Sequence, residues 1–142
     1  MSRGSRIMAV LRVRRLQEQQ AQAQAYAADQ QAVADAAASM LAEQVLDQDA
    51  PVTEASVSDW QGTRAGLLAR ARQAAALSRV AEQSAARADV TRAQWLEHHE
   101  RVALLERLAE AQRLSAARSV LAARQSASDD IANARFGREP QS

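Results

Sequence analysis

The run Glu97-His98-His99-Glu100 brings together side chains of the types that bind metal ions. Successive residues of a helix point about 100° apart, so His98 and His99 cannot bind one ion together. Zinc-binding helices place two histidines four residues apart instead. Glu97 and Glu100 could share an ion with a partner chain, but nothing else in the sequence suggests it. We therefore interpret the run as a solvated polar turn with His98 facing a neighbouring helix, and we expect no metal and no cofactor.

Other catalytic patterns are missing from the sequence. It has no cysteine, which excludes thiolate and disulfide chemistry. It also has no nucleophile elbow, no glycine-rich phosphate loop and no carboxylate pair that a cleft could desolvate. We expect a protein that is not an enzyme.

Alanine dominates the apolar composition. The 142 residues include 35 alanines, against one Phe, one Tyr and two Trp. Alanine buries little apolar area, but it is the best helix former and allows two helices to approach closely. The composition therefore favours long helices over a compact core.

The placement of proline and glycine predicts two long helices in a single elongated domain. Pro51 ends the first helix, and Gly137 and Pro140 end the second. Ser58-Asp59-Trp60-Gln61 reads as a capping box, in which the Ser58 hydroxyl accepts a hydrogen bond from the Gln61 amide. The expected segments are helix 1 (about 6–49), a connection (50–57), helix 2 (about 58–136) and a tail (137–142).

Each expected helix carries a heptad seam, with residues recurring at alternating spacings of three and four. The seam expected in helix 1 is Leu16, Gln19, Ala23, Tyr26, Gln30, Val33, Ala37, Met40 and Gln44. The seam expected in helix 2 is Ala88, Thr91, Trp95, His98, Val102, Leu105, Ala109, Gln112 and Ala116.

Two long helices joined by a short connection should pair as an antiparallel coiled coil, because neither buries its seam alone. Residues 21–60 carry seven acids and no base, whereas residues 61–142 carry thirteen arginines and nine acids. If the helices pair from the loop outwards, three ion pairs form at about 0.2–1 kcal/mol each. They are Glu43 with Arg64, Asp35 with Arg72, and Asp29 with Arg79.

The same register leaves the end of helix 2 without a partner. Helix 1 would span roughly 65 Å and helix 2 roughly 110 Å, so the overhang would begin at Ala103. Large aliphatic residues gather in this stretch: Leu104, Leu105, Leu108, Leu114, Val120, Leu121 and Ile131. An unpartnered apolar helix face marks a docking site for another protein, a dimer contact, or a helix that folds back on itself.

The arginines do not form a phosphate-binding stripe. The net charge is only +1, and acids are interspersed along helix 2, which argues against nucleic-acid binding. Arg12, Arg14 and Arg15 form a small basic cluster, read as a solvated turn, with anionic lipid as the functional alternative. The apolar stretch before Arg12 is too short for a signal peptide or a membrane span, so we expect a cytosolic protein. Met8 offers a second start, and the residues before it look dispensable.

The two tryptophans stand out in an aromatic-poor chain. Trp95 falls in the seam of helix 2, where packing is the simplest interpretation. Trp60 is expected at the hairpin tip, where it either packs or anchors a partner.

Three stretches resemble one known family. The run from Trp95 to Glu110, with Arg101, Leu104, Leu105 and Leu108 inside it, resembles the C-terminal signature of the FliJ family of flagellar export proteins. The run Asp129–Arg135 is similar to that family's ending, and Val10–Glu18 to its first helix. The chain departs from the family in its alanine-rich seams and its lack of lysine.

The resemblance implies a stalk-like component of the flagellar type III export apparatus. Its partners would be the export ATPase hexamer, the cytoplasmic domain of the membrane export gate, and export chaperones. The Leu104, Leu105 and Leu108 face, flanked by Arg101 and Arg107, would be the contact surface. The alternatives are an injectisome stalk protein, a self-associating scaffold, and a protein that binds nucleic acid or a membrane surface.

Overall fold

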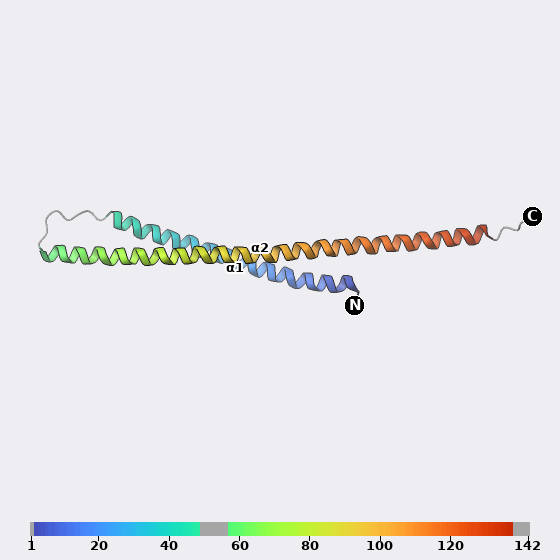
Figure 1. Ribbon diagram of the computed structural model, residues 1–142, viewed down its shortest axis with the longest axis horizontal. Helices are drawn as coiled ribbons and strands as arrows, with labels where there is room; N and C mark the ends of the chain where they lie inside the picture. Colours follow the sequence, from blue (N-terminus) through green and yellow to red (C-terminus); the bar gives the residue numbers. More distant parts are fainter. Residues whose placement is uncertain (1, 49–56, 138–142) are drawn as a thin grey trace, which may run out of the picture. The chain divides into compact units, whose positions relative to one another are not determined.

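The computed structural model describes residues 2–48 and 57–137, and these residues form two helices. Helix α1 spans Arg3–Asp47 (45 residues) and α2 spans Val57–Phe136 (80 residues) (Figure 1). The part of the chain described here contains no strand. The prediction of an all-α, two-helix fold is confirmed.

A serine fixes the start of α1. The Ser5 amide donates to Ser2 Oγ at 3.2 Å, and the Arg6 amide donates to the Ser2 carbonyl at 3.2 Å. Ser2 is therefore the N-cap, which satisfies amides that a helix start leaves unpaired. Helix α1 begins three residues earlier than the expected Arg6, because this cap lies upstream of it.

The expected capping box at the start of α2 is wrong. Ser58 lies inside the helix, which begins at Val57, so it cannot serve as the N-cap. At the other end α2 finishes at Phe136, as expected, and the Gly137 amide donates to the Asn133 carbonyl at 2.8 Å. None of the described glycines has a positive φ, so Gly137 ends the helix without a left-handed cap. The expected end of helix 1 at Asp49 and Pro51 lies outside the described residues.

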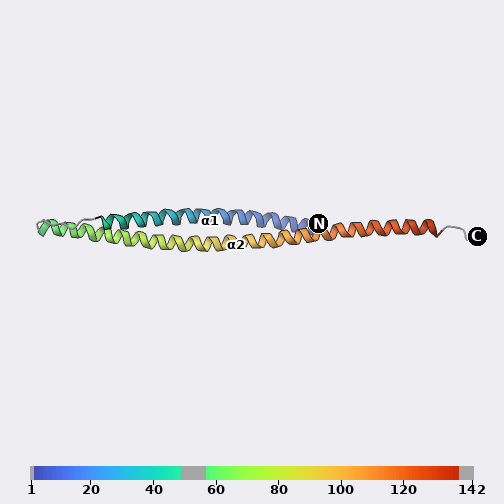
Figure 2. The ribbon, with the colours of Figure 1, turned by 90° about the horizontal axis from the view of Figure 1, so that it is seen from above.

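Both helices contribute to two units of mutually contacting residues. We call residues 17–48 and 57–98 the hairpin unit, and residues 2–16 and 99–137 the terminal unit. In the hairpin unit the two helical segments run antiparallel, side by side (Figure 2).

Alanine forms the α1 side of the seam in the hairpin unit. The buried residues are Ala21, Ala25, Ala28 and Ser39, and Ala32, Asp35, Ala42 and Leu46 are half-buried between and beyond them. These positions recur at spacings of three and four, as a heptad requires. The expected α1 seam is wrong, because all nine of its members, including Tyr26, Val33 and Met40, are exposed. Small residues permit close approach of two helices. Helix α1 therefore packs against α2 through its alanines, and the expected seam, whose members each lie two residues earlier in the chain, stays outside the contact.

The α2 seam was predicted correctly. Ala88 and Val102 are buried, and the other expected members up to Gln112 are half-buried. Ala116 alone of the nine is exposed. The seam also continues toward the start of α2 through four further residues, which are Ala74, Leu77, Ala81 and Ser84.

Two polar contacts between α1 and α2 show the register of the hairpin unit. Arg92 Nη2 lies 2.8 Å from Asp29 Oδ1, and Ser84 Oγ donates to Asp35 Oδ2. The expected register, which paired Asp29 with Arg79 and Asp35 with Arg72, is therefore wrong. It assumed that pairing starts at the loop, whereas the first buried residue of α2 is Ala74.

The interior of the terminal unit contains larger side chains. Leu11 is only 2% exposed and Val102 only 4%, and Ile7 and Leu105 are half-buried. Arg15 Nη2 lies 3.2 Å from Glu106 Oε1, so this part of α2 has α1 beside it. The overhang therefore does not begin at Ala103, as expected. It begins after Ala116, because α1 starts as early as Arg3 and covers α2 up to that point.

Neither α1 nor α2, over the residues that the structure describes, has a stretch long and apolar enough to cross a membrane.

Candidate docking surfaces

No segment within residues 2–48 and 57–137 covers the end of α2. We call residues 117–136 the C-terminal extension, and each of them is exposed. Its large apolar side chains are Val120, Leu121, Ile131 and Phe136. Three arginines and two aspartates accompany them, namely Arg118, Arg124, Arg135, Asp129 and Asp130. An exposed helix that mixes apolar and charged residues in this way can bind another helix in a groove or a bundle.

The residues expected to make the partner contact divide into two sets. Leu104 and Leu108 are 62% and 52% exposed, and Arg101 and Arg107 are exposed as well. Leu105 is half-buried and belongs to the seam of the terminal unit. Leu104 and Leu108 are thus accessible to a partner, and Leu105 supports the helix pair from inside.

Trp60 lies in the first turns of α2. It is 52% exposed, and the Arg64 guanidinium carbon lies 5.4 Å from the centre of its ring. A cation above an aromatic ring is attracted to the negative face of the ring, which restricts the side chain. Trp60 is therefore partly ordered by a neighbour on its own helix while one side of its indole stays open to solvent.

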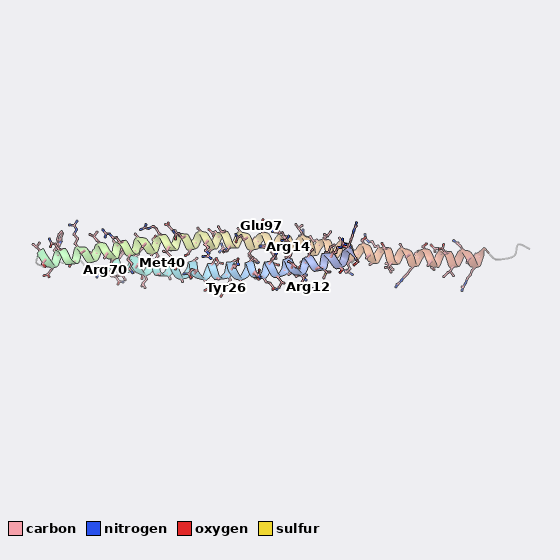
Figure 3. All side chains as sticks on the ribbon, turned by 90° about the horizontal axis from the view of Figure 1, so that it is seen from below. Arg12, Arg14, Tyr26, Met40, Arg70 and Glu97 are labelled. Carbon is pink, nitrogen blue, oxygen red and sulfur yellow. The ribbon has the colours of Figure 1, made fainter. Side chains whose placement is uncertain are left out.

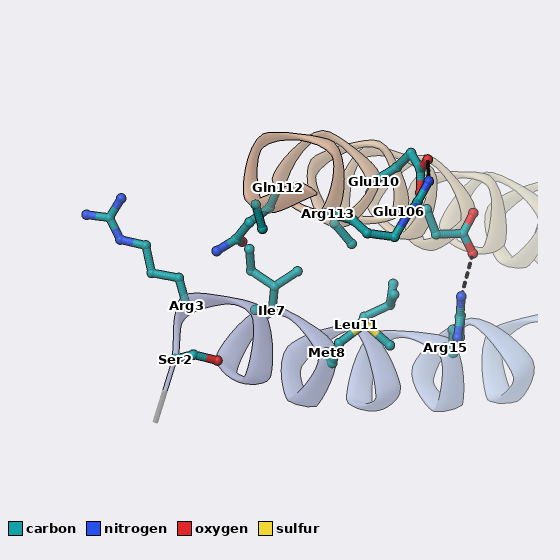
Figure 4. Close-up of a pocket in the computed structure, with 13 residues that line it drawn as sticks. Ser2, Arg3, Ile7, Met8, Leu11, Arg15, Glu106, Glu110, Gln112 and Arg113 are labelled. Carbon is teal, nitrogen blue, oxygen red and sulfur yellow. Dashed lines mark hydrogen bonds and ion pairs between the residues drawn. The ribbon is translucent and has the colours of Figure 1, made fainter. Parts of the chain in front are cut away.

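A groove that the sequence did not predict lies in the terminal unit (Figure 4). It has a volume of about 810 Å³, and Ile7, Met8 and Leu11 of α1 line it opposite Ala109 and Gln112 of α2. Alanine and glutamine on the α2 side leave room beside the larger α1 residues. The signal in the sequence was the apolar run from Ile7 to Leu11, although the residues before Met8 were expected to be dispensable.

Charged side chains close the rim of this groove. Arg15 pairs with Glu106 there, and Arg113 donates to both carboxylate oxygens of Glu110, at 2.7 and 3.0 Å. The side-chain hydrogen bond from Arg113 lowers the pKa of the Glu110 carboxyl from its usual value. Glu110 therefore remains ionised to lower pH than an isolated glutamate.

The basic cluster near the N-terminus is not a uniform cationic patch. Arg12 is exposed, Arg14 is half-buried, and Arg15 is engaged by Glu106. An anionic surface would have to compete with the Arg15 ion pair, which weakens the lipid alternative.

The histidine run places His98 in the seam, as expected. Its Nδ1 is buried and has no hydrogen-bond partner among the described residues. Residues 2–48 and 57–137 contain no group of three or more His, Cys, Asp or Glu side chains that could hold a metal ion.

Another surface that sequence reasoning missed is on α1. Tyr26, Val33 and Met40, expected in the seam, are 68%, 67% and 60% exposed. Figure 3 labels Tyr26 and Met40 on α1. Their seven-residue spacing was visible in the sequence, but it was assigned to the wrong contact.

Comparison with known proteins identifies no relative. No protein-family model matches the chain, and neither a curated protein nor a solved structure shows significant similarity to it.

Proposed function

We propose that this chain is a non-enzymatic, stalk-like component of the bacterial flagellar type III protein export apparatus. In this proposal it docks on the export ATPase hexamer and on the cytoplasmic domain of the export gate, and it also meets export chaperones. It works in the cytoplasm, at the inner face of the membrane beneath the flagellum, and supports flagellum assembly and motility.

The observation that carries the proposal is the exposure of the apolar residues near and beyond the end of the α1 contact. Leu104 and Leu108 are exposed although their neighbour Leu105 packs inside. The C-terminal extension continues with further exposed aliphatic residues. A helix that leaves large apolar side chains such as Leu104 and Leu108 exposed is suited to binding other proteins.

The flagellar assignment rests on the resemblance of the run from Trp95 to Glu110, together with Val10–Glu18 and Asp129–Arg135, to the FliJ family. An injectisome stalk protein has the same requirements and is the alternative within this class. A scaffold that associates through its C-terminal extension is the alternative from another class.

The test is genetic complementation. A strain deleted for this gene is complemented with wild type, with Leu104→Asp/Leu108→Asp, or with the control Leu68→Asp, which changes an exposed leucine of the hairpin unit. We expect the wild type and the control to restore swimming and filament growth. The double variant should retain full helicity but fail to restore either, because it places two carboxylates in the proposed contact.

Three results separate the alternatives. Normal swimming of the deletion strain excludes the flagellar role. Loss of effector secretion with intact swimming points to the injectisome. Restoration by the double variant removes Leu104 and Leu108 from the docking surface.

A further inference from the structure

Helix α1 carries a second heptad stripe on the side that α2 does not cover. We call it the outer stripe, and its members within the hairpin unit are Gln19, Ala23, Tyr26, Gln30, Val33, Ala37, Met40 and Gln44. All eight are exposed. The same helix therefore has one stripe that packs against α2 and another that has no partner within the described chain.

The outer stripe lies on an uncharged helix face. Between residues 19 and 42 the only charged residues are Asp29 and Asp35. Both are engaged by α2, through Arg92 and Ser84 respectively. Helix faces that remain in water normally carry charges, and the exposed part of α2 in the same unit does so, at Arg87 and Glu97 among others. A face of Gln, Ala, Tyr, Val and Met has no cation for the phosphates of a nucleic acid or an anionic membrane, and no charge to pair with a strongly charged helix.

We propose that the outer stripe binds the outer stripe of a second copy of this chain, with the two α1 helices antiparallel. The stripe is complementary to itself in this orientation. With the two-fold axis between Gln30 and Val33, Tyr26 faces Ala37 of the second copy. Met40 faces Ala23 of the second copy in the same way.

The remaining layers also fit. Gln30 faces Val33 of the second copy, and at the ends Gln19 faces Gln44 of the second copy, where two amides can hydrogen-bond. A parallel pair would instead stack Tyr26 on Tyr26 and Ala23 on Ala23. Large layers would then alternate with empty ones, which a close-packed interface does not tolerate.

Charges beside the stripe agree with the antiparallel pairing. Glu43 and Asp29 flank the stripe. Glu43 faces Gln22 of the second copy, and Asp29 faces Ala36 of the second copy. Like charges are therefore not brought together, although both α1 segments are acidic.

The size of the contact sets its strength. Residues 19–44 span roughly 38 Å, and a strip about 10 Å wide on each of two helices amounts to roughly 800 Å² in total. This is below the range of permanent dimers, so we expect reversible association that depends on concentration. The outer stripe shares no residue with the proposed docking face or the C-terminal extension, so the dimer does not depend on the proposed function.

Sedimentation velocity over a wide concentration range tests the contact. We expect the wild-type chain to shift from monomer to dimer, and Val33→Glu/Met40→Glu to weaken the dimer at least about tenfold, because carboxylates are buried without partners. The control Val90→Glu alters an exposed valine of α2 and should dimerise as the wild type does. Circular dichroism establishes that all three have the same helix content.

The orientation is tested by disulfide formation, since the chain has no cysteine of its own. A mixture of Ala23→Cys and Met40→Cys chains should form mainly the mixed disulfide, because these positions face each other only in the antiparallel pair. A wild type that remains monomeric throughout overturns the proposal. A dimer that persists in Val33→Glu/Met40→Glu also overturns it, because that dimer would associate through another surface. Disulfides that form only between two Ala23→Cys chains or two Met40→Cys chains overturn it as well.

Discussion

The interiors of the hairpin unit and the terminal unit use different side chains to hold the same two helices. The fully buried residues of the hairpin unit are five alanines and Ser39, and Asp35 and Ser84 meet across its seam. The terminal unit instead buries Leu11 and Val102 and leaves a groove beside them. Small residues are therefore buried in one contact, and a few large aliphatic residues are buried in the other. Opposite kinds of substitution should damage the two units.

Truncation should have the largest effect in the terminal unit. Leu11→Ala removes its most deeply buried side chain, and we expect a loss of about 2–5 kcal/mol in the stability of that unit. Leu16→Ala, which shortens an exposed leucine of the same helix, should change stability little. Thermal unfolding followed by circular dichroism measures both. Equal effects of the two variants would contradict the assignment of Leu11 to the interior.

Enlargement should damage the hairpin unit. Ala88 is 4% exposed in the seam, and Ala88→Leu inserts extra carbons between closely packed helices, at an expected cost of about 1–3 kcal/mol. Ala86→Leu adds the same carbons at an exposed position of α2 and serves as the matched control. If both variants unfold at the wild-type temperature, the alanine seam is not closely packed.

A smaller effect of opposite sign is expected at His98. Its buried Nδ1 lacks a hydrogen bond among the described residues, and such a group costs about 1–3 kcal/mol. His98→Leu removes that atom at a half-buried seam position and should raise the midpoint of urea unfolding. His99→Leu, at an exposed position, is the comparison. A lower midpoint for His98→Leu would show that the imidazole makes a favourable interaction in solution.

The sequence predicted the two helices because alanine favours a helix and proline and glycine end one through their own backbone preferences. These local preferences are sufficient to locate the helices. It also predicted the α2 seam, since Val102 and Leu105 share one stripe with Trp95. On α1 two heptad stripes compete, and we chose the one with larger side chains, Tyr26 and Met40. Size was the wrong criterion, because the pairing depends on how closely two helices approach, which alanine favours.

The register and the docking surfaces were harder to predict for the same reason. Charge matching from the loop gave a plausible series of ion pairs, but exposed ion pairs are too weak to determine a register. Pairing instead begins well inside α2, at Ala74, and this moves the partner of Asp29 by thirteen residues, from Arg79 to Arg92. The exposed Leu104 and Leu108 were anticipated, whereas the outer stripe and the groove depend on the register and were missed.

The central claim is that α1 presents its alanine face to α2 in the Asp29–Arg92 register, which leaves the larger side chains outside. The most direct measurement is intramolecular crosslinking of two double-cysteine variants, Asp29→Cys/Arg92→Cys and Asp29→Cys/Arg79→Cys. The experiment uses a crosslinker with a reach of about 8 Å at a protein concentration low enough to exclude dimers. The two α2 positions lie roughly 20 Å apart along the helix, so the reagent separates them. Our account predicts efficient crosslinking of the 29–92 pair and none of the 29–79 pair; the reverse result would contradict it.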